Sequence, residues 1–414
     1  MRLKDVTHIN RQVIPETTDP EHSFRYIDIS AIDSLGRITT PNELMSFGAA
    51  PSRARRLAPV GSTVISTVRT YLRAIAQVPP TAETLLFSTG FAVVEAKSVA
   101  DDRFVGYVCR SGPFVDEVVA RSVGVSYPTI NPSELGDIEI ALPSLDEQRR
   151  IADFLDAETA RIDALTEARS RALSLLDERV SAVIRRALQG GNLDSRDVSA
   201  SAVPWLARHP EHWKAAPLRY LSRIQRGASP RPIEDPIYFD DEGSHGWVRI
   251  SDVTSSQKYL KSTEQRLSPL GRQLSVPLEP GELFLSIAAT VGKPIITRIP
   301  CCIHDGFVAI RRPQLNTEFL YYALLLGDAF RGLGKLGTQL NLNSDTVGSI
   351  IMPVPPAAEQ QMLIAEIEGP LGQISSQRDL ISRQLALLFE RRQALITAAV
   401  TGQVDVTTAR GVAP

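Results

Sequence analysis

The feature that most constrains this chain is an internal repeat with a long period. Residues 142–148, LPSLDEQ, are matched 212 residues later by VPPAAEQ at residues 354–360. Upstream the correspondence continues while the offset drifts to about 221, because loops differ in length between the copies. A repeated segment is a repeated structural unit. The 414 residues therefore predict two diverged copies of one unit, which suits a chain too long for a single hydrophobic core.

Each copy has a mixed part followed by a long helix. In the first copy, short apolar runs separated by Gly and Pro occupy residues 24–32, 63–68, 91–96 and 136–143. Such runs predict strands and turns. Ala-, Leu-, Arg- and Gln-rich segments then predict helices over about Asp146–Leu188 and Glu359–Val400. Gly190 and Gly402 follow these segments, at the position where glycine ends helices.

Both predicted helices carry an apolar stripe that advances in alternating steps of three and four residues. The stripe runs from Ala152 to Ala187 in the first helix and from Ile364 to Ala399 in the second, about five heptads each. An amphipathic helix lying on a globular core is the alternative interpretation. Two equal stripes in one chain favour helices that pair with each other, each about 60 Å long.

Charge and cysteine content exclude several classes of protein. The 45 basic and 47 acidic residues give a net charge of −2, which excludes a strongly cationic protein that coats nucleic acid, although a local basic groove remains compatible. Three cysteines cannot form an even disulfide framework. The most apolar stretch, residues 319–330, is too short to cross a bilayer. We therefore expect a soluble, cytoplasmic protein with no membrane contact.

The sequence contains no convincing catalytic or metal motif. Residues 332–337 match G-x-G-x-x-G, but they follow a helix-like run instead of a strand and are interpreted as a loop. Residues 235–238, DPIY, depart from the base-holding loop of amino-methyltransferases and predict a turn. Cys301, Cys302 and His304 lack metal-ligand spacing and are interpreted as a buried segment. We predict no catalytic, cofactor or metal site.

Four passages carry a resemblance to a known family. They are PEHWK leading to PLRYL at residues 210–221, PGELFLS at residues 280–286 followed by Gly292 and Lys293, and the Glu-Gln helix starts at residues 147–148 and 359–360. In this order, and duplicated, they resemble the specificity subunit of type I restriction–modification systems. The first copy departs from the pattern, since it starts at Leu3 without the Trp-containing segment and its turn at residues 66–71 has no Gly-Lys pair.

The resemblance implies an α+β fold. It consists of two mixed α/β target recognition domains separated by two long helices, the conserved spacer helices of that family, which pair as an antiparallel coiled coil. The implied boundaries are residues 1–142 for the first recognition domain, 143–190 for the first spacer helix, 191–351 for the second recognition domain, 352–402 for the second spacer helix and 403–414 for a tail.

The resemblance also implies a non-catalytic, DNA-binding role. Each recognition domain would read one half of a bipartite, asymmetric target in double-stranded DNA, and the helices would set the spacing and dock two methyltransferase (M) subunits. Those partners would bring S-adenosylmethionine and methylate adenine N6, so this chain would need no cofactor; restriction/translocase (R) subunits could join. The alternative is a coiled-coil scaffold that bridges protein partners without base readout.

Candidate DNA contacts are basic, hydroxyl and amide side chains in predicted loops, the groups that contact phosphates and base edges. In the first domain they are Arg53, Arg55, Thr67, Arg69, Tyr71 and Arg73. In the second domain they are Arg226, Ser229, Arg231, Thr290, Lys293, Gln339 and Asn341. A surface arginine that contacts only solvent, and turn hydrogen bonds for residues 339–341, are the alternative interpretations.

Overall fold

The computed structural model describes residues 1–81, 83–124, 127–193, 198–200, 202–333 and 342–406. The chain divides into two compact units. Unit 1 comprises residues 1–171 and 381–414, and unit 2 comprises residues 172–380. Each unit contains the mixed part of one sequence copy together with segments of both long helices.

Unit 1 contains two four-stranded sheets, ordered β1-β8-β5-β6 and β3-β2-β7-β4. Its strands are β1 (Thr7–Ile9), β2 (Ser23–Ile27), β3 (Met45–Ser46), β4 (Ala54–Leu57), β5 (Thr63–Ser66), β6 (Ile75–Gln77), β7 (Leu85–Ser88) and β8 (Phe91–Ala96). Its shorter helices are α1 (Leu3–Val6), α2 (Asp102–Arg110), α3 (Gly112–Ala120) and α4 (Pro132–Gly136), with 3-10 turns η1 (Ile29–Ala31), η2 (Phe47–Ala49) and η3 (Thr70–Leu72).

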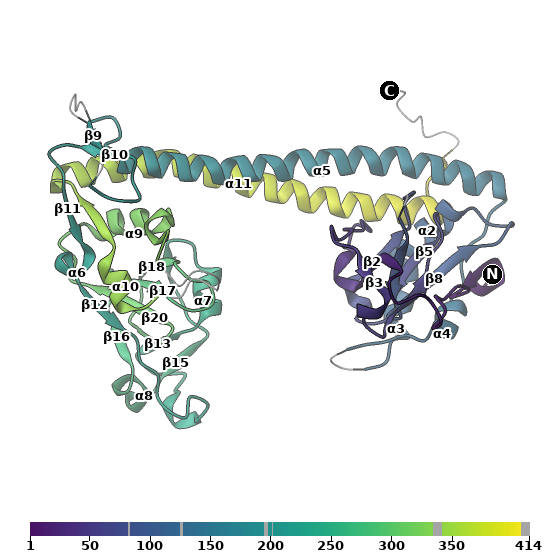
Figure 1. Cartoon of the computed structure of the whole chain (residues 1–414), viewed down its shortest axis with the longest axis horizontal. Helices are drawn as coiled ribbons and strands as arrows, with labels where there is room; N and C mark the ends of the chain where they lie inside the picture. Colours follow the sequence, from purple (N-terminus) through teal and green to yellow (C-terminus); the bar gives the residue numbers. More distant parts are fainter. Residues whose placement is uncertain (82, 125–126, 194–197, 201, 334–341, 407–414) are drawn as a thin grey trace. The chain divides into compact units, whose positions relative to one another are not determined.

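The two sheets of unit 1 share a core because β5, β7 and β8 are apolar on the faces that meet. Phe87 and Phe91 pack edge to face there, with ring centroids 5.8 Å apart. Helix α2 lies against β5 and β8 on the other face of this sheet (Figure 1). Buried side chains of α2 and α3, including Phe104 and Phe114, share an apolar cluster with that face. The central strands are therefore buried on both sides, which explains their nearly continuous apolar sequence.

Unit 2 repeats the two sheets of unit 1, with one extra strand in the first sheet, and adds two pairs of strands. Its sheets are ordered β12-β20-β17-β18-β14 and β15-β13-β19-β16, with the pairs β11-β21 and β10-β9. The strands are β9 (Val198–Ala200), β10 (Arg208–Pro210), β11 (Lys214–Pro217), β12 (Arg223–Arg226), β13 (His245–Val248), β14 (Tyr259–Leu260), β15 (Gln265–Leu267), β16 (Val276–Leu278), β17 (Leu283–Ser286), β18 (Pro294–Thr297), β19 (Cys301–Ile303), β20 (Phe307–Arg311) and β21 (Ile351–Val354). The shorter helices are α6 (Leu218–Leu221), α7 (Ile250–Ser255), α8 (Pro269–Gln273), α9 (Thr317–Leu325) and α10 (Ser344–Ser349), with 3-10 turns η4 (Pro236–Tyr238) and η5 (Asp328–Phe330).

The strand pairing confirms the duplication predicted from the sequence. Each unit has a parallel pair at the equivalent place, β2 with β7 and β13 with β19, next to an antiparallel pair, β4 with β7 and β16 with β19. The additional strand of unit 2, β14, also pairs parallel, with β18. The first helix is a single turn in both copies, α1 and α6, in agreement with the sequence alignment of residues 3–6 with residues 218–221.

The two long helices are also confirmed. Helix α5 spans Leu145–Leu188 and α11 spans Ala357–Val400, 44 residues each, and α11 continues through Pro370. Gly190 and Gly402 have φ angles of 110° and 72°, a conformation that side chains with a Cβ rarely adopt, so glycine follows each helix end for a backbone reason.

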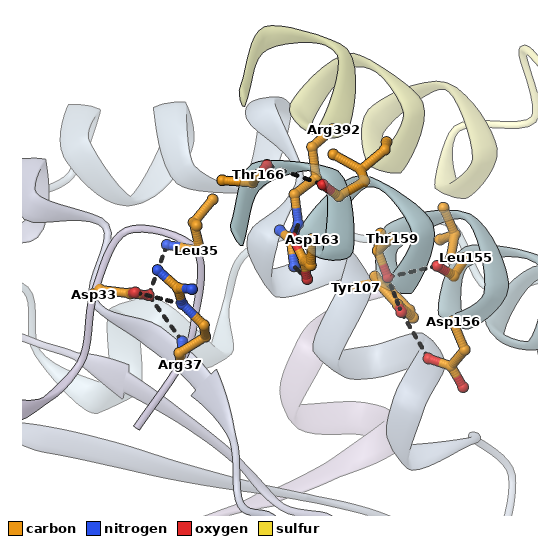
Figure 2. Close-up of polar contacts among 11 residues, drawn as sticks. Asp33, Leu35, Arg37, Tyr107, Leu155, Asp156, Thr159, Asp163, Thr166 and Arg392 are labelled. Atoms are coloured by element: carbon orange, nitrogen blue, oxygen red, sulfur yellow. Dashed lines mark hydrogen bonds and ion pairs between the residues drawn. The ribbon is translucent and has the colours of Figure 1, made fainter. Parts of the chain in front are cut away.

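Helices α5 and α11 run antiparallel in both units. In unit 1 the start of α5 and the end of α11 share one apolar cluster, which includes Leu155 and Ile396, and Arg392 forms an ion pair with Asp163 at 3.0 Å (Figure 2). In unit 2 the end of α5 shares a cluster with the start of α11, and Arg378 pairs with Asp177 at 3.0 Å. These observations confirm the antiparallel coiled coil.

Other sequence predictions differ in outcome. The run at residues 91–96 is β8, and residues 235–238 form the predicted turn, η4. Residues 136–143 were expected to form a strand, but they make only an isolated bridge between Glu139 and Arg2. Cys301 and Cys302 are buried in β19, as predicted. The domain boundaries stay predictions, and residues 334–337 of the glycine motif lie outside the described residues.

Across the described ranges, none of the helices has the length and apolarity needed to span a membrane.

Candidate nucleic-acid interface

The loop that joins β5 to β6 carries four of the predicted contacts: Thr67, Arg69, Tyr71 and Arg73. The base of this loop is fixed by hydrogen bonds. The Ser66 hydroxyl donates to the Val68 carbonyl at 2.6 Å. The backbone N–H and the hydroxyl of Thr67 both donate to the Gly90 carbonyl, at 2.8 and 2.9 Å. Thr67 is buried, so its hydroxyl holds the loop to the β7–β8 turn.

Arg69 is presented on the exposed side of this loop. Its φ angle is 50°, in the left-handed region, and its backbone N–H donates to the Pro128 carbonyl at 2.8 Å. The guanidinium lies over the ring of Tyr127, 4.7 Å from the centroid. A guanidinium stacked in this way keeps its N–H edge free to donate to a phosphate or a base. Arg69 is therefore the predicted contact whose geometry is best suited to binding.

The other residues of this loop are held differently. The Thr70 hydroxyl lies 2.8 Å from the Ser122 hydroxyl, which ties the centre of the loop to the segment after α3. Tyr71 is 54% exposed, so its ring is free to contact a ligand. Arg73 also has a left-handed φ, 54°, and its guanidinium lies 3.7 Å from the carboxylate of Asp116.

Arg53 and Arg55 lie at the start of β4. The carbonyl of Arg53 accepts a hydrogen bond from Thr89, next to Gly90, and its Nε donates to the Tyr26 hydroxyl at 3.1 Å. The side chain of Arg53 is exposed. Its backbone is connected to the β5–β6 loop through the β7–β8 turn, because Thr89 bonds to Arg53 and Gly90 bonds to Thr67. Arg55 is half-buried, and its guanidinium lies over the ring of Phe47 at 5.0 Å.

In unit 2, three predicted contacts converge on Asp305. Arg226 donates to the Asp305 carbonyl at 3.0 Å. The Ser229 hydroxyl donates to one carboxylate oxygen at 3.0 Å, and Arg231 donates to the other at 3.3 Å. The structure therefore brings together residues that the sequence placed in one Gly- and Pro-rich loop.

Asp305 is ionised in this setting. Partial burial opposes its charge, but the hydrogen bond from Ser229 and the nearby His304 and Arg231 hold the pKa of the carboxyl below its ordinary value. The carboxylate thus offsets part of the positive charge of the loop. A carboxylate can accept a hydrogen bond from the exocyclic amino group of a base, whereas the neighbouring arginines can only donate.

The turn between β17 and β18 contains Thr290 and leads into Lys293. Its base is built like that of the β5–β6 loop, since the backbone N–H of Ile287 donates to the Gly306 carbonyl at 2.8 Å. Ala289 has a left-handed φ of 56°. Gly292 has a φ of 87°, and an added Cβ would lie 3.1 Å from the Phe330 ring, so this turn requires glycine for both reasons.

Lys293 is less available than the sequence suggested. Its ammonium group donates to the backbone carbonyls of Thr254 and Ser256 at 3.1 and 2.7 Å. Burial lowers the pKa of Lys293. Thr290 is exposed, and its hydroxyl lies 3.4 Å from that of Thr254. The tip of this turn therefore presents hydroxyl groups, with the lysine behind them.

The remaining predicted contacts, Gln339 and Asn341, lie outside the described residues. Asn343, next to them, accepts hydrogen bonds from the backbone of Asp345 and Thr346, both at 2.9 Å, and caps α10. Among the residues with described positions, no three His, Cys, Asp or Glu side chains gather as metal ligands.

Sequence reasoning missed Tyr127 and Asp305. Tyr127 supports Arg69 from 58 residues away in sequence, and Asp305 contacts Arg226 from 79 residues away. An exposed aromatic residue among small and polar ones was the only available signal for Tyr127, and Asp305 had none beyond its place before Gly306.

Comparison with known proteins supplies independent findings. A family model described as the type I restriction modification DNA specificity domain matches residues 1–174 and again residues 210–381. The specificity subunit of the type I restriction enzyme StySPI of Salmonella potsdam is 25% identical over 208 residues, which cover 47% of this chain and 43% of that subunit. The specificity subunit of the EcoKI enzyme of Escherichia coli K12 is 24% identical over 210 residues, 47% of this chain and 44% of that subunit.

The matched region thus spans less than half the length of these two relatives. A solved structure covers more of the chain. It concerns the complex assembly and conformational transition of the type I R-M system, and one of its chains is 25% identical, with a TM-score of 0.69 over 98% of this chain and 97% of that chain.

Proposed function

Because the chain belongs to the family of type I restriction–modification DNA specificity subunits, which are non-catalytic, we propose that each of its two recognition domains reads one half of a bipartite, asymmetric DNA target. The observation that carries this proposal is the duplicated loop. A buried serine ends the inner strand in both copies, and the next residue donates to a glycine carbonyl, Gly90 or Gly306. Two loops anchored in the same way on corresponding sheets suit two half-sites.

The chemistry of the two loops supports an asymmetric target. Unit 1 presents a guanidinium stacked on an aromatic ring, Arg69 on Tyr127. Unit 2 presents hydroxyl groups at residues 254 and 290 and the Asp305 carboxylate, which accepts hydrogen bonds from Ser229 and Arg231. Donor-rich and acceptor-containing loops select different base edges in the major groove.

The long helices are proposed to set the spacing between the half-sites and to dock two methyltransferase subunits. At about 1.5 Å per residue, a 44-residue helix is about 65 Å long. Both helices also expose large apolar side chains: Leu165, Leu175, Leu380, Leu387 and Phe389. Exposed apolar side chains along a helix pair suit further helices packing against them.

The proposed assembly acts in the cytoplasm, where the methyltransferase partners bring S-adenosylmethionine and methylate adenine N6, and restriction/translocase subunits join to cleave unmethylated DNA. Base flipping and chemistry then belong to the partners. The net charge of −2 suits this division, since sequence-independent attraction to phosphates would come mainly from the other subunits.

The test is to co-express the chain with the methyltransferase subunits of its own system and to map methylated adenines by sequencing. We expect one split motif, of which one half changes when residues 1–142 are exchanged for those of a relative. Arg69→Ala should lower methylation about tenfold, the usual cost of one lost base contact. Arg37→Ala is the matched control, because Arg37 is exposed and paired with Asp33 at 2.7 Å.

No motif, or a motif that the exchange leaves unaltered, would contradict the proposal and favour a coiled-coil scaffold that bridges proteins without base readout. An unchanged motif in Arg69→Ala, with methylation equal to that of Arg37→Ala, would remove Arg69 from the readout while leaving the two-domain proposal in place.

A further inference from the structure

A glutamine near the start of each long helix fastens the helix to the mixed domain of its own unit. In unit 1, the Gln148 side chain accepts from the backbone N–H of Asp101 at 2.8 Å and donates to the Pro143 carbonyl at 2.9 Å. In unit 2, Gln360 accepts from the backbone N–H of Asn316 at 2.7 Å and donates to the Pro355 carbonyl at 2.8 Å. Both glutamines are buried, at 0% and 4% exposure.

The residue whose backbone N–H each glutamine binds also caps a helix with its side chain. Asp101 caps α2 by accepting from the backbone of Arg103 and Phe104, both at 3.1 Å. Asn316 caps α9 by accepting from the backbone of Glu318 at 2.8 Å. Each glutamine therefore fixes the N-terminus of the domain's own helix against the start of the long helix.

A second contact lies further along the same two helices. The Tyr107 hydroxyl of α2 donates to Asp156 of α5 at 2.6 Å (Figure 2). The Tyr322 hydroxyl of α9 donates to Glu368 of α11 at 3.2 Å. Both tyrosines are 3% exposed, and burial raises the pKa of each to about 12, so both hydroxyls stay protonated donors.

In each unit a basic side chain also pairs with the carboxylate that the tyrosine binds, but the two basic residues belong to different elements of the fold. In unit 1, Arg103 of α2 lies 2.8 Å from Asp156. In unit 2, Lys258, just before β14, lies 2.6 Å from Glu368. We call each set of glutamine, tyrosine, carboxylate and cation a joint. Two separated contacts prevent a helix from rotating about either one, so a joint fixes an angle as well as a position.

We propose that the joint is a positioning device, which holds each recognition domain at a set angle on its long helix and thereby determines the length of DNA between the half-sites that the complex accepts. This inference rests on the proposed function. Tyr107, Gln148, Tyr322 and Gln360 are then positioning residues, since they act through the domain that they orient and are absent from the predicted DNA contacts.

The experiment uses the full chain in complex with its methyltransferase subunits and a DNA library in which the two half-sites are separated by spacers of varied length. Methylation of each spacer class is counted by sequencing. The variants are Tyr107→Phe with Gln148→Ala in unit 1, and Tyr322→Phe with Gln360→Ala in unit 2. The two Tyr→Phe single variants, which each remove one hydroxyl, keep the test valid should the double variants fail to fold.

The chain offers matched controls at equivalent places outside the joint. The Thr7 hydroxyl donates to the Leu3 carbonyl at 2.7 Å, and the Ser222 hydroxyl donates to the Leu218 carbonyl at 3.0 Å. Thr7→Val and Ser222→Ala each remove one buried hydrogen bond without touching the long helices. They should change methylation of all spacer classes by the same factor.

For the joint variants we expect methylation at spacers one base pair longer or shorter to rise about fivefold relative to the preferred spacer, the factor that one net hydrogen bond contributes to an equilibrium. The half-site sequences should stay the same. An unchanged spacer distribution with a lowered Tm would show a merely structural role and overturn the inference alone. A wild-type complex that methylates no split motif would overturn the proposed function, and this inference with it.

Discussion

Units 1 and 2 share a scaffold but differ in what the scaffold presents. Both have the same order of strands, a hairpin loop anchored on a glycine carbonyl, and a glutamine–tyrosine joint to a long helix. The loops differ. In unit 1 the Arg69 guanidinium lies over the Tyr127 ring and pairs with no carboxylate among the described residues, whereas in unit 2 Arg231 donates to the Asp305 carboxylate. The shared parts are those that hold a domain on a helix, and the divergent parts are those placed to meet a ligand.

The helix pair differs between the units as well. In unit 1 the side chain of Arg392 is 5% exposed where it pairs with Asp163, and its Nη1 has no hydrogen-bond partner among the described residues. In unit 2 the side chain of Arg378 is 50% exposed where it pairs with Asp177. One ion pair is therefore part of a core, while the other lies in solvent.

The largest predicted effect follows from this contrast. Arg392→Ala should lower the free energy of unfolding by about 3 kcal/mol, because it leaves the half-buried Asp163 carboxylate without its partner. Arg378→Ala should cost less than about 1 kcal/mol, as exposed pairs do. Urea denaturation of the full chain, with hydrogen exchange to assign the loss to a unit, measures both.

A double variant separates loss of a partner from loss of the pair. Arg392→Met with Asp163→Leu should recover most of the stability, since apolar side chains of similar volume replace a buried pair well. Equal costs for Arg392→Ala and Arg378→Ala would show that the two halves of the helix pair are energetically alike, contrary to their burial.

The second prediction concerns a contact present in only one copy. Glu359, the third residue of α11, accepts from the Trp213 indole N–H at 2.7 Å and lies 2.8 Å from His212 Nε2. Glu147, the third residue of α5, is exposed, and in the described part of the chain its carboxylate accepts no hydrogen bond. Glu359→Ala should therefore cost about 1.5 kcal/mol of unfolding free energy and Glu147→Ala much less.

The two substitutions remove the same charge from the same helical position, so their effects on the helix dipole cancel in the comparison. Thermal unfolding followed by tryptophan fluorescence suits the test, because Trp213 reports on the contact itself. A Tm loss of equal size in the two variants would mean that the Trp-containing segment adds nothing to the second copy.

The sequence predicted what is periodic or repeated. The spacing of apolar residues located both long helices, and β8 coincides with its predicted run because a strand buried on both faces has a continuous apolar sequence. The run at residues 136–143 has the same appearance, yet only Glu139 pairs there. A strand needs a partner paired over several residues: β21 of unit 2 pairs with β11 over four residues, whereas Glu139 of unit 1 pairs with Arg2 alone.

Contacts between side chains far apart in sequence were beyond the sequence analysis. The Glu-Gln helix starts were noticed as a motif, but the partner of Gln148 is a backbone group 47 residues earlier. The cations of the two joints, Arg103 and Lys258, do not correspond in the alignment of the copies. A charge can be supplied from any element that folds close to the acid, so only the folded structure identifies it.

The smallest predicted effect compares two carboxylates by pH. The pKa of Asp305 in unit 2 lies below its ordinary value, so its charge stabilises the fold above about pH 4, and that contribution is lost as the pH falls towards the folded-state pKa. Burial raises the pKa of Asp102 in unit 1, so its charge opposes folding above about pH 4. The two residues should therefore give pH dependences of opposite sign.

Asparagine variants expose this difference. Asp305→Asn should be less stable than wild type near pH 7, and the gap should close below about pH 4; since the side chain is 43% exposed, solvent screening keeps the gap below about 1 kcal/mol. Asp102→Asn should be at least as stable as wild type near pH 7, with that advantage also vanishing below about pH 4. Urea midpoints measured from pH 3 to pH 7 test both. If the two gaps had the same sign, the charge of Asp305 would be no better stabilised by its surroundings than that of Asp102. The contrast between the Asp305 carboxylate paired with Arg231 in unit 2 and the Arg69 guanidinium stacked on Tyr127 in unit 1 would then not hold.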